Sequence, residues 1–119
     1  MRWNNANKYH NNKITEGGET FDSQGEYTRW CELKLLERAG SIANLRRQVR
    51  FELLPNQYRT DEKGRRRCVE RSLGYVADFV YEEGGKTIVE DYKGMQTDAF
   101  RIKKKLMLYI HDIEIRLTK

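Results

Sequence analysis

The pattern of hydrophobic and polar positions predicts two helices in this chain. Ser23, followed three residues later by Glu26, forms a capping box that opens a helix over residues 23–39, which ends before a glycine. Thr97 or Asp98 opens the second helix. Its core face is predicted from apolar residues at helical spacing: Ala99, Ile102, Leu106 and Tyr109.

Alternating apolar and polar residues predict strands between and after these helices. The predicted strands cover residues 48–54, 75–81, 87–93 and 113–117. Gly84-Gly85 joins the second and third strands as a hairpin, and a smaller hairpin with two glycines is predicted at 14–21. The polar stretch 56–67 is predicted to be a mobile basic loop. The order helix, strand, strand, strand, helix, strand predicts an α/β (α+β) fold with a central mixed sheet flanked by helices.

Composition limits the chain to one small domain. Its 119 residues are 38% hydrophobic and 34% charged, which allows a modest core under a heavily charged surface. We expect a loose polar and basic arm over residues 1–13 and a single domain over 14–119. No apolar run is long enough to span a membrane, and the first residues lack the apolar core of a signal peptide, so we expect a cytoplasmic protein.

Charge and cysteine spacing narrow the chemistry. The net charge of +5 is compatible with a polyanionic partner but does not identify one. Cys31 and Cys68 lack CxxC spacing, and the histidines are His10 and His111. These residues argue against a zinc site made of cysteine and histidine and against a disulfide framework.

The predicted hairpin places two aspartates side by side. With Gly84-Gly85 as a two-residue turn, the register that pairs Glu83 with Lys86 also pairs Asp78 with Asp91. Two carboxylates on one face repel each other, and the valines beside them predict a half-buried setting that increases the cost. A hard divalent cation such as Mg²⁺ or Mn²⁺ would offset this repulsion.

Lys93 lies two residues beyond Asp91 and therefore on the same face of the strand. Paired carboxylates with an adjacent ammonium are typical of metal-dependent nucleases, in which the lysine positions water or stabilises charge on the phosphate. The alternative is an ordinary ion pair between Lys93 and one aspartate, in a register broken by a bulge. Glu26 shares a helix face with Trp30 and Leu33 and could reach the metal, or it could serve as the capping-box glutamate.

The spacing of the aspartates and the lysine resembles a known nuclease motif. Asp78, followed thirteen residues later by Asp91-Tyr92-Lys93, is similar to the PD-(D/E)XK motif, with Ala77 at the position of its proline. Residues 14–117 resemble a family of small phage and prophage proteins in that superfamily. The segments that carry this likeness are Phe21-Asp22-Ser23-x-x-Glu26, Tyr75-Val76-Ala77-Asp78-Phe79, Val89-Glu90-Asp91-Tyr92-Lys93-Gly94 and Phe100-Arg101-Ile102-Lys103-Lys104-Lys105-Leu106.

The resemblance implies a PD-(D/E)XK restriction-endonuclease-like core and a metal-dependent endodeoxyribonuclease that uses Mg²⁺ or Mn²⁺. It assigns Asp78 and Asp91 as metal ligands, the backbone carbonyl of Tyr92 as a further ligand, Lys93 as the catalytic lysine, and Glu26 as the acidic residue of the first helix and an additional candidate ligand. Glu90 points to the opposite face in the predicted register and is excluded from the site.

The resemblance further implies a phage Holliday junction resolvase acting on branched DNA in the host cytoplasm. A chain without room for a separate sequence-reading domain is expected to select DNA by shape, unless a partner targets it. Symmetric cleavage of a four-way junction requires two active sites related by a twofold axis, so a homodimer is expected. The alternatives are another phage DNA nuclease that nicks or degrades DNA in replication or recombination, and a non-catalytic DNA-binding protein with the same fold. Two basic clusters could contact phosphates or form a solvated surface: Arg65, Arg66 and Arg67, and Lys103, Lys104 and Lys105.

Overall fold

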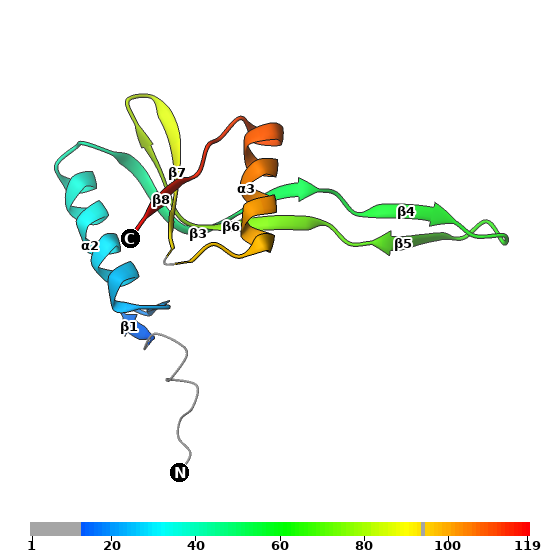
Figure 1. Ribbon diagram of the computed structural model, residues 1–119, viewed down its shortest axis with the longest axis horizontal. Helices are drawn as coiled ribbons and strands as arrows, with labels where there is room; N and C mark the ends of the chain where they lie inside the picture. The colour runs from blue at the N-terminus through cyan, green and yellow to red at the C-terminus, as the bar shows by residue number, and fades with distance from the viewer. Residues whose placement is uncertain (1–12, 94) are drawn as a thin grey trace, which may run out of the picture.

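The computed structural model describes residues 13–93 and 95–119 and shows a small α+β fold with two helices and a mixed sheet (Figure 1). The elements follow in the order β1 (Ile14–Glu16), β2 (Glu19–Phe21), α2 (Gln24–Arg38), β3 (Ala43–Leu54), β4 (Gln57–Thr60), β5 (Arg66–Glu70), β6 (Leu73–Glu83), β7 (Lys86–Tyr92), α3 (Asp98–His111) and β8 (Arg116–Thr118).

The central sheet has the strand order β3-β6-β7-β8. β3, β6 and β7 are antiparallel neighbours, whereas β8 returns through α3 and pairs parallel to β7. The turn between β6 and β7 consists of Gly84 and Gly85, whose φ angles of 60° and 80° suit glycine. The predicted register is confirmed from Glu83–Lys86 to Phe79–Glu90. The predicted mixed sheet between two helices is therefore confirmed.

The two helices pack on opposite faces of this sheet. Leu33 of α2 lies in a buried cluster with Phe79 and Tyr81 of β6. Met107 of α3 lies in the other cluster, with Val80 of the same strand. Since neighbouring residues of a strand point to opposite faces, α2 and α3 enclose the sheet between them. The predicted caps are also present, because the side chains of Ser23 and Thr97 accept hydrogen bonds from the first turns of α2 and α3.

The core face of α3 differs from the predicted one. Phe100 and Met107 are buried, whereas Ala99 is exposed and Ile102 and Tyr109 are 57% and 87% exposed. Leu106, the remaining predicted residue, is partly buried against the core: it alone of the four contacts the cluster. The buried side of α3 passes between Phe100 and Met107 over the half-buried Lys103 and Lys104. Because the aliphatic stems of lysines can cover apolar surface, the buried stripe is not the most apolar one.

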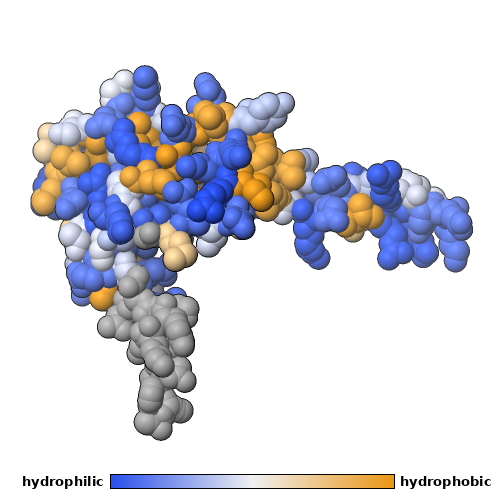
Figure 2. Space-filling model, viewed as in Figure 1, coloured by the Kyte–Doolittle hydropathy of each residue, from blue (hydrophilic) through white to orange (hydrophobic). Residues whose placement is uncertain are grey.

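The predicted basic loop at 56–67 is wrong, since this stretch forms most of a third hairpin, besides β1–β2 and β6–β7. β4 and β5 pair antiparallel, and Asp61 closes the turn by accepting the N–H groups of Lys63 and Arg65. We call residues 57–70 the basic hairpin. It projects from the body as an extension of β3 and β6 (Figure 1), and its visible surface is almost entirely hydrophilic (Figure 2). Neither strand has an apolar face, so the sequence shows no alternation of hydrophobic and polar residues that would predict a strand here.

Other predictions differ only at element ends or lie outside the description. The hairpin at 14–21 is confirmed by the pairing of β1 with β2. β3 begins at Ala43, before the predicted start of its strand, and β8 is shorter than predicted. The arm predicted over residues 1–13 lies outside the described residues, apart from Lys13. Within the described part of the chain, neither helix has the length and apolar character needed to cross a bilayer.

Candidate functional site

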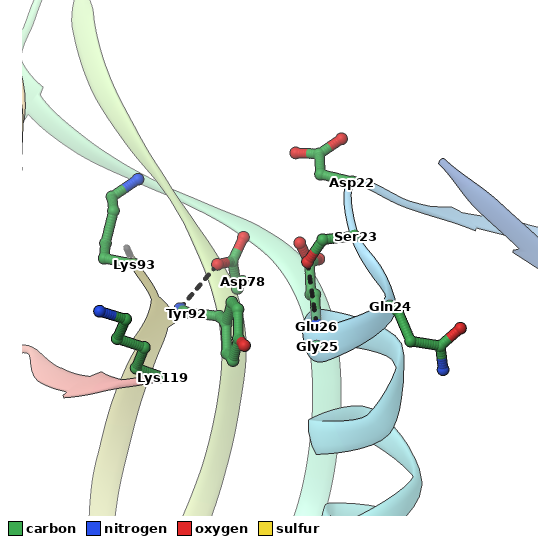
Figure 3. A pocket seen from close by; sticks show the side chains of 9 residues that line it. All are labelled: Asp22, Ser23, Gln24, Gly25, Glu26, Asp78, Tyr92, Lys93 and Lys119. Carbon is green, nitrogen blue, oxygen red and sulfur yellow. Dashed lines mark hydrogen bonds between the residues drawn. The ribbon is translucent and has the colours of Figure 1, made fainter. Parts of the chain in front are cut away.

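A cavity of about 390 Å³ lies between the first turn of α2, the middle of β6, the end of β7 and the last residue, Lys119 (Figure 3). Four of the predicted site residues line it: Glu26, Asp78, Tyr92 and Lys93. Glu26 approaches from α2, across the cavity from the strands that carry the others. Lys119, which sequence reasoning missed, also lines the cavity and follows directly after β8.

Asp78 stands where the β6–β7 ladder ends. Its Oδ2 accepts a hydrogen bond from the backbone N–H of Tyr92 at 2.9 Å (Figure 3), and its Oδ1 accepts one from Gln48 Nε2 at 3.5 Å. Burial raises the pKa of Asp78 to about 7, and the negative charge of Asp91 adds to this effect. The Tyr92 hydrogen bond and Lys93 act in the opposite direction. Asp78 is therefore a carboxylate whose charge is incompletely stabilised.

Asp91 is 2% exposed and lacks full compensation for its charge. Its Oδ2 lies 3.2 Å from Lys93 Nζ but accepts no well-formed hydrogen bond from the described residues. Lys93 also lies over the ring of Phe100, 4.8 Å from its centroid, so the ammonium is shared between the carboxylate and the ring. Burial raises the pKa of Tyr75, and the negative charges of Asp91 and Asp78 raise it further. A buried acceptor without a partner is costly.

Glu26 lies in the capped first turn of α2, and its carboxylate also lines the cavity. Its backbone N–H donates to Ser23 Oγ at 3.1 Å, which caps the helix. Its carboxylate is 95% buried and accepts a hydrogen bond from Arg47 Nη2 at 3.2 Å. Burial raises the pKa of Glu26, the charge of Asp78 raises it further, and Arg47 lowers it. The carboxylates of Glu26 and Asp78 therefore repel each other across the cavity.

Arg47 and Gln48 of β3 belong to the site and were missed. The Arg47 guanidinium lies 3.9 Å from the ring centroid of Phe21 and bridges Glu26 to Glu19, whose Oε1 is 2.7 Å from Nη1. Gln48 has a φ of 53° within the strand, an uncommon conformation for a residue other than glycine. No local motif marks either residue, because their partners lie far away in the sequence.

Gly25 lets the aromatic ring of Tyr92 pack against the start of α2. A β-carbon at position 25 would overlap the Tyr92 hydroxyl and crowd the ring. The tight approach brings the end of β7 next to the helix turn that carries Glu26. The glycine at the third position of the predicted helix was the available signal, but its purpose depends on the Tyr92 ring, which is distant in the sequence.

Glu90 has a different environment from its neighbour Asp91, and its predicted orientation away from the site is confirmed. Arg29 of α2 donates to its two carboxylate oxygens at 2.6 and 2.9 Å, and the Tyr81 hydroxyl donates at 2.6 Å. Burial raises the pKa of Tyr81 to about 12, and its hydrogen bond to Glu90 adds to the effect. Glu90 is a fully buried structural charge that joins α2 to the sheet.

The two predicted basic clusters lie outside this cavity. Arg65, Arg66 and Arg67 are on the basic hairpin. Lys103 lines an adjacent cavity of about 280 Å³ together with Lys93 and Phe100, while Lys105 is exposed. The structure therefore places part of the α3 cluster beside the site and the hairpin cluster on a separate projection.

The carboxylates of Asp78 and Asp91 are the oxygen donors that the site offers to a divalent cation. In residues 13–93 and 95–119, no three His, Cys, Asp or Glu side chains are grouped closely enough to hold a metal ion. Asp78 and Asp91 nevertheless present oxygen donors, one of them without a hydrogen-bond partner, and this chemistry suits Mg²⁺ or Mn²⁺. The residues fit a cation held by two carboxylates and completed by water or a substrate oxygen.

Comparison with known proteins identifies a family without an assigned function. No curated protein and no solved structure matches the chain. A match to one family extends over residues 6–119 and therefore includes every element and the whole candidate site. The chain belongs to the family described as "Protein of unknown function (DUF1064)".

Proposed function

We propose that this protein is a metal-dependent, structure-selective endodeoxyribonuclease with a PD-(D/E)XK core, and that it resolves Holliday junctions. The observation that carries the proposal is the buried Asp91 oxygen without a hydrogen-bond partner, 3.2 Å from the ammonium of Lys93. Lys93 and Asp78 line the open cavity, whereas Asp91 lies behind them and does not line it. Two incompletely compensated carboxylates weaken a fold, so their presence together points to a ligand that completes the compensation.

Each side chain has a role that follows from its position. Asp78 and Asp91 would hold Mg²⁺ or Mn²⁺, with the Tyr92 carbonyl as a further donor. A bound cation of this kind polarises a phosphate and lowers the pKa of bound water. Lys93, held between Asp91 and Phe100, would stabilise the negative charge that develops on the phosphate. Glu26 faces the same cavity and would orient water or add a ligand.

The order of elements supports the proposed core. A helix with an acidic residue in its first turn precedes an antiparallel sheet, whose central strands carry Asp78 and the Asp91-Tyr92-Lys93 segment. A further helix and a parallel strand follow. Cleavage at symmetric positions of a four-way junction requires two such sites related by a twofold axis, so the proposal includes a homodimer.

Cleavage of a labelled four-way junction beside a linear duplex of the same sequence tests the proposal. The reactions contain Mg²⁺, Mn²⁺ or EDTA and compare the wild type with Asp78→Asn. Paired symmetric incisions that require the metal and disappear in the variant are expected. Metal-dependent cutting without a junction preference would replace the resolvase by another DNA nuclease. Junction binding without cutting would indicate a non-catalytic DNA-binding protein.

A further inference from the structure

The basic hairpin concentrates positive charge on a projection that has no core of its own. Every residue of β4 and β5 is exposed. Five basic and three acidic residues lie within 57–70, and four of the five are arginines. A two-stranded hairpin without a packed face is marginally stable, and exposed strand edges favour unwanted association. The hairpin therefore contributes little to the stability of the fold, which points to an external ligand.

Two arginines face each other across the hairpin. Arg59 and Arg67 are directly paired in the β4–β5 register, where like charges destabilise the ladder. Across the residues that the structure describes, neither side chain makes an ion pair. Arg65 differs, because its Nε lies 3.2 Å from Asp61 Oδ2. The facing pair is a compact positive charge without an internal counterion.

Arginine also occupies the other face of the hairpin. Arg66 pairs with Thr60, one position along from the Arg59–Arg67 pair, and its guanidinium lies 3.8 Å from the ring centroid of Tyr58. Successive residues of a strand point to opposite faces, so the ribbon presents guanidinium groups on both sides. The stacking holds Arg66 in place while leaving it exposed.

The shape of the hairpin suits double-stranded DNA. The major groove of B-form DNA, about 12 Å wide, admits a two-stranded β-ribbon, whereas the major groove of an RNA duplex is too narrow. Guanidinium groups on both faces of such a ribbon would meet the phosphates on both walls of the groove. The paired part of the ribbon, from Gln57 to Thr60, extends roughly 10 Å at about 3.3 Å per residue, and the turn continues beyond it.

We infer that the basic hairpin binds the major groove and phosphates of a DNA duplex, as a contact separate from the candidate active site. The inference rests on the proposed function for its choice of DNA as ligand. It deepens that function by adding a second DNA-binding surface to the protein. Asn56 Oδ1 accepts the Ser72 N–H at 2.6 Å across the base of the hairpin, which anchors its direction relative to β3 and β6.

Salt-dependent binding to a labelled linear DNA duplex in EDTA tests this inference. The reference protein carries Asp78→Asn, so that cleavage does not interfere, and the test protein adds Arg59→Gln and Arg67→Gln. A charge-matched control adds Arg38→Gln and Arg46→Gln instead, two exposed residues at the end of α2 and near the start of β3. We expect about tenfold weaker binding from the hairpin variant at moderate salt, and a slope of log K against log salt that is less steep by about two.

A further pair of variants and probes separates the remaining explanations. Arg59→Lys with Arg67→Lys should retain the slope, because both charges remain. Equal binding by the hairpin variant and the charge-matched control would overturn the inference, as would preferential binding of an RNA duplex or a change in oligomeric state that accounts for the loss. The nuclease proposal is scored separately by cleavage, so a wild type that binds through the hairpin but cuts nothing would leave this inference standing alone.

Discussion

Glu90 and Asp91 are adjacent, fully buried carboxylates of one strand, and they show two ways to treat a buried charge. Glu90 faces α2, where Arg29 binds both oxygens and Tyr81 donates a third hydrogen bond. Asp91 has Lys93 at 3.2 Å and keeps one oxygen without a hydrogen bond from the described residues. The contrast separates a charge that holds the fold together from one that awaits a ligand.

The difference also explains why burial alone does not identify a functional carboxylate. The oxygens of a fully paired carboxylate such as Glu90 are already occupied by hydrogen-bond donors, so a cation would not stabilise it further. Asp91 and Asp78 instead raise each other's energy, which a cation would reverse. The useful criterion is whether the hydrogen-bonding capacity of the buried group is satisfied.

The largest expected effect distinguishes the two carboxylates by activity. Asp91→Asn should lower metal-dependent cleavage by about a thousandfold, because it removes a ligand charge from the reacting centre. Glu90→Gln should leave cleavage by the folded protein within about tenfold of the wild type, since Glu90 faces the opposite side of the strand from Asp91 and is bound by Arg29 and Tyr81. Initial rates on a labelled junction, measured well below the melting temperature of each variant, provide the test. Equal losses in both variants would contradict the distinction.

The second effect concerns stability, and here the substitution of Glu90 is expected to be the damaging one. Glu90→Gln should lower the free energy of unfolding by about 3 kcal/mol, because Arg29 would keep a partly buried charge without its main partner. Glu32→Gln is the matched control, since Glu32 also pairs with Arg29, at 3.0 Å, but its side chain is 55% exposed. Urea denaturation should show a change of less than about 0.5 kcal/mol for this control. A similar change in both variants would show that burial does not matter here.

The third effect depends on pH. The folded-state pKa of Asp78 is raised to about 7, so the folded protein binds more protons than the unfolded chain between about pH 4 and 7, and stability falls as pH rises through this window. In EDTA, Asp78→Asn should stabilise the fold by about 2 kcal/mol at about pH 8, and this gain should vanish near pH 4. Asp98→Asn, at an exposed carboxylate, is the control. A gain that is independent of pH would contradict the explanation.

The smallest effect tests how the site is assembled. Gly25→Ala should destabilise the fold by about 1 kcal/mol, although alanine favours helices, because its β-carbon would overlap the Tyr92 ring. Combining it with Tyr92→Phe should recover part of the loss, since the nearest overlapping atom is the hydroxyl oxygen. Gln24→Ala provides the exposed control in the same turn. Strictly additive losses in the double variant would argue against this contact.

Much of the fold was predictable because its determinants are local. The caps of both helices and the Gly84-Gly85 turn are short motifs, and the turn alone sets the register from Glu83 to Phe79. The basic hairpin was missed because its strands bury nothing and show no hydrophobic period. The buried face of α3 was misassigned because lysine stems cover part of the core.

The candidate site was predictable where it lies next to that register. The β6–β7 ladder ends at Phe79–Glu90, one pair before the predicted Asp78–Asp91 pair, and the Asp78 side chain accepts the Tyr92 N–H there. Asp78, Asp91 and Lys93 still belong to one hairpin, so their proximity needs no long-range information. Arg47 and Gln48 come from β3, and their contacts with Glu26 and Asp78 depend on how separate elements pack. Such contacts leave no trace in local spacing.

Cation binding, followed together with thermal unfolding, tests the central claim most directly. Calorimetric titration of Mn²⁺ into the wild type, Asp91→Asn and Glu90→Gln should show binding to the wild type and to Glu90→Gln, and none to Asp91→Asn. Saturating Mn²⁺ at about ten times the dissociation constant should raise the melting temperature of the first two proteins by about 5 °C. A wild type that binds no cation, or an Asp91→Asn variant that binds as tightly, would contradict the claim that Asp91 awaits a metal.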